Sequence, residues 1–568
     1  ARYPGRAPFR RKPIRNRTSP AASARSWLHF SVLLWLALVV VAILWRPILP
    51  VDETRYLGVA WEMWMRGDWL VPYLNGEPYS HKPPLLFWLM KIGWAIFGIN
   101  DITPRLVAPL FGLGNLFLTA AIARQLWPDR PDIAERAPLI LIGSLFWTMF
   151  TSLTMFDMML AACALAGIGG IVSAWRTGGC GGWLVTALAI GIGVLAKGPA
   201  ILLHIAPVAL LAPWWGRALP GAPNLPLISW RAWYGRFLLS VLIGAAIALL
   251  WAIPAGIRGG EEYRNMIFWG QSAGRIVESF DHARPFWGYA VLLGPLLLPW
   301  LVWPRLWRAV REKGAFADGG FRLLVAWVAP AFITFSLISG KQLHYLLPEF
   351  PAFALLFARL LAQQNATDGR RFDGLIAALF FFVLGAAAML LPDDPTFFDA
   401  PEWFHRLDNH WGFLIVISGL FCWHFTQSTA FRGVCALALS MTVLVFVVHL
   451  TARDALSFAY DLRPIAQGLK KLEDKGIPLG NFGTYHGQYQ FLGRLTKPMT
   501  ELGVDEKITA AFIRDKPEGV IVAYYYLDEL PEFPDGVTPL AEFQFRSYAV
   551  YFWRAGLLNR SPDLADRS

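Results

Sequence analysis

Acidic and basic side chains gather in the segment PVDETRYLGVAWEMWMRGDWLVPYLNGEPYSHKPPLLFWL (50–89), directly after an apolar stretch. Asp52 and Glu53 suit proton abstraction, or stabilisation of a positive charge at a membrane-borne substrate. Lys82 offers a fixed cation for a phosphate, where it would stabilise negative charge that grows in a transition state. A purely structural interpretation of Asp52 stays open, since an Asp at this place also caps a helix that begins at Glu53 or Thr54.

His81 adjoins Lys82 and is the only imidazole in this segment. With a carboxylate from a later loop, such as Glu262, it could bind a divalent ion that orders the two loops. The ordinary interpretation of a lone histidine is that it is not a ligand. The chain has no DxD-type nucleotide-sugar signature, so no cofactor is expected to be required, and the His81–Glu262 ion would be structural.

The composition places these residues in a membrane protein. Of 568 residues, 55% are hydrophobic and only 16% are charged, whereas a soluble domain has about a quarter charged residues. A helix needs about 20 apolar residues to cross a bilayer. Candidate spans are 27–46, 104–126, 137–153, 158–175, 183–197, 198–213, 237–254, 286–303, 321–338, 345–362, 373–391, 412–428 and 431–450.

The short apolar stretch 83–98 begins with two prolines and contains Lys91, and its treatment decides the topology. Counting it as a span would turn the basic cluster at 304–320 outward, against the positive-inside tendency. We therefore expect 83–98 to lie at the interface and about thirteen helices to cross. The residues that follow Asp52 are expected to form an amphipathic helix lying flat on the membrane.

The basic arm 1–26 then stays in the cytoplasm, and the transmembrane part covers 27–451, with large outer loops at 47–103 and 255–285. The net charge of +11 is thus explained by orientation, and no nucleic-acid partner is expected. Residues 452–568 change character, with β-rich runs at 519–526 and 543–553. They predict a small extra-cytoplasmic α/β domain.

Several cations lie on the predicted outer side, where the orientation rule does not explain them. Lys197 stands in a tight KGP turn, although a lone lysine can simply snorkel to the surface. Tyr345 of HYLLP (344–348) lies at the mouth of a span and could bond a phosphate or sugar oxygen, or belong to the interfacial aromatic belt. The cations are Arg55, Lys82, Lys197, Arg258, Arg264, Arg275, Arg284 and Lys341.

Four motifs in order carry a family resemblance: DETRY followed by SHKPPL, SLTMFDMMLA (152–161), LAKGP (195–199) and SGKQLHYLLPEFPAFALL (339–356). With them the chain resembles membrane glycosyltransferases of the C-type superfamily. It is most similar to the aminoarabinose transferases that modify lipid A, which are relatives of the protein O-mannosyltransferases. The resemblance covers the membrane part and extends in outline to the C-terminal region.

The resemblance implies a mainly α-helical fold and roles for particular residues. Asp52 and Asp157 match the two catalytic-site acids, and Lys82 matches the lysine that holds the donor phosphate. Further candidate donor-phosphate ligands are Arg264 or Arg275, whose guanidinium could bind phosphate beside Lys82, and Tyr345. Arg264 and Arg275, in the predicted outer loop 255–285, could instead anchor lipid headgroups. The candidate substrate-binding residues are Glu53, Tyr79 and Lys197.

The implied reaction is inverting transfer of 4-amino-4-deoxy-L-arabinose from undecaprenyl phosphate to a lipid A phosphate, at the periplasmic face of the inner membrane, a change that gives polymyxin resistance. The expected partners are the lipid-linked donor, lipid A and membrane lipids, with the protein a monomer. Two alternatives remain: a protein O-mannosyltransferase, and a flippase for a lipid-linked sugar. A flippase typically shows repeat symmetry and charges near the bilayer midplane, and neither is visible here.

Overall fold

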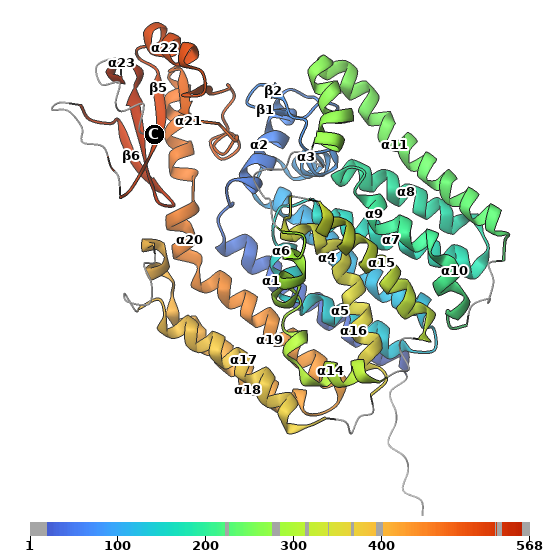
Figure 1. The fold of residues 1–568 in the computed structure, drawn as a ribbon. Coiled ribbons are helices and arrows are strands. Elements are labelled where there is room, and N and C mark those ends of the chain that lie inside the picture. Colours follow the sequence, from blue (N-terminus) through green and yellow to red (C-terminus); the bar gives the residue numbers. More distant parts are fainter. Residues whose placement is uncertain are drawn as a thin grey trace, which may run out of the picture.

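The computed structural model describes residues 20–221, 227–274, 285–312, 317–338, 340–364, 369–393, 401–528, 530 and 537–558, without the side chains of 20–26 and 271–274. Figure 1 shows a large bundle of helices with a β-sheet at its upper left corner. The upper end of the bundle carries the first loop, with the short helices α2 and α3.

The first half of the bundle runs from the N-terminus to a long, bent helix, α11. Helices α7 and α8 are antiparallel neighbours, and α4 packs on α7. The elements are α1 (Pro20–Trp45), α2 (Asp52–Met65), β1 (Tyr73–Leu74), β2 (Glu77–Pro78), α3 (Leu85–Phe97), α4 (Ile102–Leu126), α5 (Pro131–Ile142), α6 (Leu145–Thr151), α7 (Asp157–Thr177), α8 (Cys180–Lys197), α9 (Ile201–Leu210), α10 (Ala212–Trp215), η1 (Gly216–Ala218), α11 (Trp230–Asn265) and the π-helix η2 (Met266–Gly274).

The second half of the bundle contains shorter helices, and α17, α18 and α19 pack in sequence. Its elements are α13 (Gly288–Leu296), η4 (Trp300–Val302), α14 (Pro304–Arg311), α15 (Gly319–Leu337), η6 (Leu343–Glu349), α16 (Phe350–Leu361), α17 (Arg371–Leu390), η8 (Glu402–Arg406), η9 (Asn409–Trp411), α18 (Gly412–Thr426) and α19 (Ala430–Thr451).

Eight helices of the described chain are long and apolar enough to cross a membrane, and two bent pairs raise the number to ten. The bent pairs are α5 with α6 and α9 with the segment Ala212–Ala218, and all ten coincide with predicted spans. The predicted spans 286–303, 345–362 and 412–428 coincide with the shorter helices α13, α16 and α18. The chain is therefore a multi-pass membrane protein, while the number thirteen stays a prediction.

The C-terminal region holds a mixed sheet with strand order β4-β3-β5-β7-β6, in which β3 pairs parallel to β4 and β5. The predicted β-rich runs coincide with β5 and with the antiparallel pair of β6 and β7. The elements are α20 (Arg453–Tyr460), α21 (Arg463–Asp474), β3 (Leu479–Phe482), β4 (Thr500–Leu502), α22 (Glu506–Asp515), β5 (Val520–Tyr526), β6 (Ala541–Phe545), β7 (Tyr548–Arg554) and α23 (Ala555–Leu558).

The first loop and the C-terminal region interlock. Asn75 donates to the Met499 carbonyl over 2.9 Å and accepts from the Met499 amide over 2.8 Å. The Trp61 indole donates to the carbonyl of Leu495 over 2.9 Å. Helix α2 is a helix as predicted, but it packs between α3 and this region instead of lying alone on the membrane, since nine of its residues are buried.

A buried ion pair ties the start of α2 to two other segments. Arg46, after the last turn of α1, forms a bidentate pair with Glu53, and both side chains are 4% exposed. The Glu53 carboxylate also accepts from the amides of Leu49 over 2.9 Å and Thr154 over 2.8 Å. Burial alone would raise the pKa of Glu53, but the charge and hydrogen bonds of Arg46, with Arg105 and the Leu49 amide, lower it to about 2.

This arrangement corrects two expectations about the DE pair. Glu53 was expected to bind substrate, yet both of its oxygens are already engaged inside the protein. Helix α2 begins at Asp52 itself, its N-cap position is Val51, and that end has no side-chain cap hydrogen bond. Asp52 therefore does not cap a helix that begins at Glu53 or Thr54.

Glu53→Gln should destabilise the fold strongly, because it keeps the shape of the side chain but leaves the Arg46 charge buried and unpaired. Loss of one partner of such a pair costs about 3–5 kcal/mol. Thermal unfolding in detergent measures this, with the exposed Glu402→Gln (59% exposed, paired with Arg406) as the control. Equal melting temperatures for the two variants would contradict the role of the pair.

The stability that the Arg46–Glu53 pair contributes depends on pH in a definite direction. The folded-state pKa of Glu53 is about 2 and its ordinary value is 4.5. The stabilisation is therefore complete above the ordinary value and is lost as the pH falls towards 2. Wild type should show this acid-dependent loss, and Glu53→Gln should lack it.

Candidate active site

Asp157 and Lys197 meet because the two helices that carry them are antiparallel. Asp157 is the first residue of α7 and Lys197 the last of α8. The Lys197 Nζ lies 2.5 Å from the Asp157 Oδ1. Asp157 is only 1% exposed, and in the described structure its second oxygen, Oδ2, is buried with no hydrogen-bond partner. One oxygen of the Asp157 carboxylate therefore contacts Lys197, and the other makes no hydrogen bond in the described structure.

Three further polar groups surround this pair. The Lys197 Nζ lies 5.0 Å from the centre of the Tyr345 ring. Lys82 and His344 are within electrostatic reach of the Asp157 carboxylate. The positive charges of two lysines are therefore concentrated around one buried acid, with His344 as a third when it is protonated.

Tyr56 is hydrogen-bonded to the first of the two aspartates. Its hydroxyl donates to the Asp52 Oδ1 over 3.3 Å. Burial, then the charges of Asp52 and, more weakly, Asp157, raises the pKa of Tyr56 well above its ordinary value, so the hydroxyl remains a donor. Asp52 itself is about half exposed, with its side chain 52% accessible, in contrast to the buried Asp157.

An aromatic floor supports these groups. The Phe156 ring is 4.9 Å from the Tyr56 ring and 5.7 Å from the Lys82 Nζ. Tyr79, predicted to bind substrate, is buried, and its ring lies 6.4 Å from that of Phe87. An apolar floor under charged groups keeps water away from one side and strengthens their electrostatic interactions.

The remaining predicted residues are Arg264, Glu262, Arg275 and His81. Arg264 is half exposed and lies 3.9 Å from Glu261, and Glu262 is exposed on the same helix. Arg275 lies outside the described residues. His81 is exposed, with its ring 5.2 Å from that of Tyr79.

The metal site proposed from His81 and Glu262 gains no support. Among the described residues, no group of three or more His, Cys, Asp and Glu side chains is placed to hold a metal ion. The two residues thus remain an isolated pair of candidate ligands.

Sequence reasoning missed two residues of this cluster. Tyr56 and His344 belong to the DETRY and HYLLP motifs, but nothing in their spacing along the sequence indicates a functional role. Their importance follows from packing, because Tyr56 donates a hydrogen bond to Asp52 and the charge of His344 acts on Asp157.

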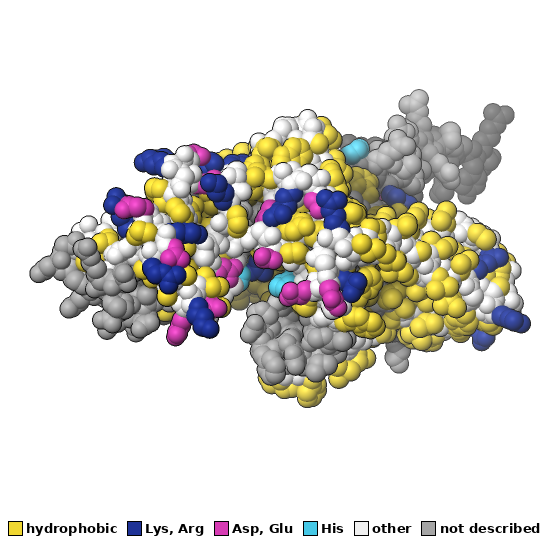
Figure 2. All heavy atoms as spheres, turned by 90° about the horizontal axis from the view of Figure 1, so that it is seen from above, with side chains coloured by type: hydrophobic (Ala, Val, Ile, Leu, Met, Phe, Trp, Pro, Cys, Tyr) yellow, Lys and Arg dark blue, Asp and Glu magenta, His cyan; other side chains and the backbone are white. Residues whose placement is uncertain are grey.

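The surface at this end of the molecule is charged. In the view from above, acidic, basic and histidine side chains gather over the left and middle, while the flank to the right is largely apolar (Figure 2). A charged end beside an apolar flank is what a membrane protein presents where it leaves the hydrocarbon.

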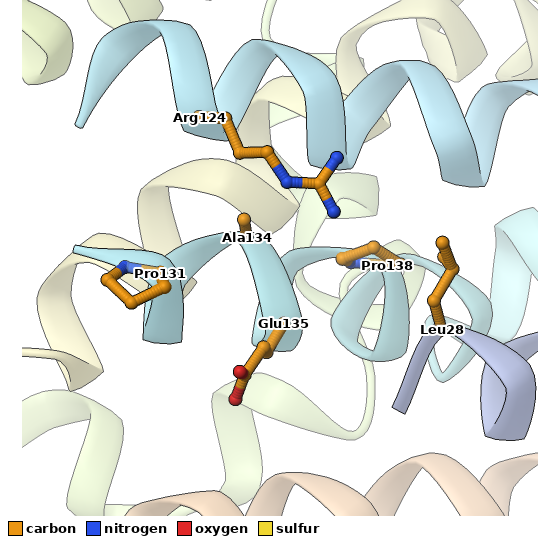
Figure 3. Close-up of a pocket in the computed structure, with 6 residues that line it drawn as sticks. All are labelled: Leu28, Arg124, Pro131, Ala134, Glu135 and Pro138. Atoms are coloured by element: carbon orange, nitrogen blue, oxygen red, sulfur yellow. The ribbon is translucent and has the colours of Figure 1, made fainter. Parts of the chain in front are cut away.

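The pocket in Figure 3 lies at the opposite ends of the helices. Its lining residues are Leu28, Arg124, Pro131, Ala134, Glu135 and Pro138. Leu28 and Arg46 lie near opposite ends of α1, and eighteen residues of helix span about 27 Å, close to the thickness of a bilayer core. This pocket is therefore separate from the acid and lysine cluster.

Comparison with known proteins adds a family context to this geometry. Residues 81–220 match the family model described as dolichyl-phosphate-mannose-protein mannosyltransferase. The chain is 32% identical over 381 residues to an undecaprenyl phosphate-alpha-4-amino-4-deoxy-L-arabinose arabinosyl transferase of Edwardsiella ictaluri. It is 29% identical over 388 residues to a protein of the same description, numbered 1, from Pseudomonas fluorescens.

These alignments cover 64% of this chain and 65% and 62% of the two relatives, so the chain spans slightly less than two thirds of their length. Among solved structures, ArnT of Cupriavidus metallidurans bound to undecaprenyl phosphate superposes with a TM-score of 0.72. That match has 18% identity and covers 94% of this chain and 98% of the other, which demonstrates a common fold. The motif resemblance is thus confirmed: the chain is similar in sequence to aminoarabinose transferases, its residues 81–220 match the model of the protein mannosyltransferase family, and its fold is that of ArnT.

Proposed function

We propose that this protein transfers 4-amino-4-deoxy-L-arabinose from undecaprenyl phosphate to a phosphate of lipid A. The observation that carries the proposal is the cluster of Asp52, Asp157, Lys82 and Lys197 at one end of the bundle. Two acids and two lysines together suit the transfer of a sugar from a phosphate. The relatives described as arabinosyl transferases support the choice of donor.

In the proposed reaction an ionised oxygen of the acceptor phosphate attacks the anomeric carbon of the donor sugar. The bond from that carbon to the donor phosphate oxygen breaks, and the electron pair leaves with undecaprenyl phosphate. The acceptor oxygen carries no proton, so the step needs no general base, and attack opposite the leaving group inverts the anomeric configuration.

The residues have different tasks in this step. Lys82 and Lys197, with Tyr345 beside them, hold the donor phosphate and stabilise its growing negative charge. Asp52 and Asp157 stabilise the positive charge that develops at the anomeric carbon and exists only in the transition state. Asp52 is the accessible acid and faces the reacting sugar. Asp157 keeps Lys197 in place through the contact between its Oδ1 and the Lys197 Nζ.

Transfer to a protein hydroxyl is the second candidate, which the family match over 81–220 favours. A hydroxyl acceptor carries a proton, and that reaction would need Asp52 as a general base. A flippase would move the lipid-linked sugar across the membrane without transferring it, so Asp52 and Asp157 would take part in no chemical step.

Topology and localisation belong to the same proposal. We place the protein in the inner membrane with thirteen crossings, counting α13, α16 and α18, and with 83–98 at the interface. Residues 1–26 would be cytoplasmic, 27–451 would form the transmembrane part with the loops 47–103 and 255–285 outside, and 452–568 would form a periplasmic domain. The proposed state is a monomer with no required cofactor.

The function is tested with purified protein, radiolabelled undecaprenyl-phosphate aminoarabinose and lipid A. Asp52→Asn and Asp157→Asn keep the side-chain shape and remove the charge, so transfer should fall by about a factor of 10²–10³. Asp505→Asn is the matched control, because Asp505 caps α22 away from the cluster and Asn caps equally well. Wild-type transfer to a protein hydroxyl but not to lipid A would favour the mannosyltransferase alternative. A near wild-type rate for Asp52→Asn would remove Asp52 from the mechanism.

The donor site is tested by binding of undecaprenyl phosphate. Lys82→Ala should weaken binding and turnover about tenfold or more, the loss of one charge-assisted contact, while Lys82→Arg should retain part of both. The exposed Lys507→Ala serves as the control. If Lys82→Ala binds the lipid phosphate as wild type does, another cation such as Arg264 holds the phosphate instead.

Orientation is tested with an impermeant maleimide on spheroplasts. Glu506→Cys, at an exposed position of α22, should react from outside. The native Cys180, exposed at the start of α8, should react only after the membrane is opened. The reverse pattern would invert the proposed topology.

A further inference from the structure

A turn of the C-terminal region lies directly against α2. The carbonyl oxygen of Gly487 is so close to α2 that a Cβ added at Gly58 would meet it at 2.9 Å. Gly487 has a φ of 71°, a conformation that glycine adopts readily, and a Cβ there would lie 2.3 Å from the Leu74 side chain. The two glycines therefore permit a contact that larger residues would prevent.

The turn is held rigidly by polar contacts behind it. The Tyr485 hydroxyl donates to the Gln490 side chain over 3.0 Å, and the Tyr489 hydroxyl is hydrogen-bonded to that of Tyr524 on β5. The Gln488 side chain also donates to the Tyr524 hydroxyl, over 3.2 Å. The position of the turn is thus defined by the sheet on one side and by α2 on the other.

This docking brings His486 to the Asp52 end of the cluster. His486 precedes Gly487 and has an exposed side chain. Arg55 lies three residues before Gly58, so both occupy the same face of α2. Partial burial and the positive charge of Arg55 lower the pKa of His486, while the carboxylate of Asp52 raises it, so both charged groups of α2 act on the imidazole that the docked turn carries.

Arg55 retains hydrogen-bonding capacity at this place. Its nearest acidic partner is Asp52, at 3.9 Å, beyond ordinary hydrogen-bond distance. In the described structure its Nε is buried without a hydrogen-bond partner. A guanidinium with unused donors, next to an exposed imidazole, suits an oxyanion that accepts from both.

We propose that Arg55 and His486 form a second anion subsite, which binds the acceptor phosphate on the Asp52 side of the cluster. This rests on the proposed function and deepens it, since it assigns the acceptor to a phosphate-bearing lipid. The donor phosphate is held by lysines next to Asp157, and the acceptor phosphate by a separate pair next to Asp52. The two anions then approach the sugar from different sides, as inversion requires.

The subsite also gives the C-terminal region a direct task. His486 is a positioning residue that orients the attacking oxygen. A neutral imidazole offers one donor, and a phosphate dianion beside it favours the doubly protonated form, which offers two. The acceptor therefore strengthens its own binding site when it arrives.

The test is steady-state transfer with the full-length protein, with donor and acceptor varied separately. His486→Ala should raise the KM for lipid A at least about tenfold, the factor for one charge-assisted hydrogen bond, and leave the KM for the donor unchanged. His486→Gln, which keeps a donor, should recover part of the loss. His410→Ala is the matched control, an exposed histidine paired with Asp408 in η9.

A double-mutant cycle separates a shared phosphate contact from two unrelated defects. Arg55→Ala alone should raise the acceptor KM, and the combination with His486→Ala should raise it by less than the product of the single effects. An unchanged acceptor KM for His486→Ala, or an equal rise in the donor KM, overturns the subsite. Absence of transfer to lipid A by wild type would instead defeat the proposed function, so the two failures are distinguishable.

Discussion

The buried pair of Arg46 and Glu53 is the constraint on which the site depends. A charge removed from water must be neutralised by a partner with good geometry, and here the neutralisation fixes the backbone as well. The same carboxylate accepts from the amide of Leu49 in the first loop and from that of Thr154 between α6 and α7. Asp52 precedes Glu53 and Asp157 follows Thr154 by three residues, so one ion pair sets the separation of the two candidate catalytic acids.

The two acids occupy opposite environments, and this difference assigns their tasks. Asp157 is buried at a helix N-terminus, where the helix dipole favours a negative charge, and is bound to Lys197. Asp52 is half exposed and receives only a long hydrogen bond from Tyr56. The buried acid organises cations, and the exposed acid is accessible to a substrate. Similar side chains thus acquire distinct chemistry from burial alone.

The C-terminal region and the first loop form one unit at the charged end of the molecule. Their contacts are backbone-directed and reciprocal, as between Asn75 and Met499. Arg494 adds a 2.8 Å ion pair with Asp101 at the start of α4. Contacts of this kind set orientation more than overall stability, because hydrogen bonds are directional whereas apolar packing is not. The region is therefore positioned well enough to offer side chains to the site.

The sequence by itself determined the membrane character, most of the helix positions and the β-rich runs of the C-terminal region. Its motifs also singled out Asp157, Lys82 and Lys197, whose charges interact in the structure and whose roles stay predictions. Those features follow from local composition and from motifs, which need no knowledge of packing. From the sequence, Asp52 was predicted to be catalytic and Glu53 to bind substrate. The burial of Glu53 against Arg46 is a tertiary contact that no local pattern announces.

Only the tertiary structure brought Tyr56 to Asp52, His344 within electrostatic reach of Asp157, and the turn that carries His486 against the helix that carries Arg55. The last pair lies more than four hundred residues apart along the chain, and no periodicity or spacing encodes such a contact. It depends on two glycines that allow close backbone approach between α2 and a distant turn. Contacts of this kind arise from the shapes of whole elements, and for that reason they become visible only when the chain is folded.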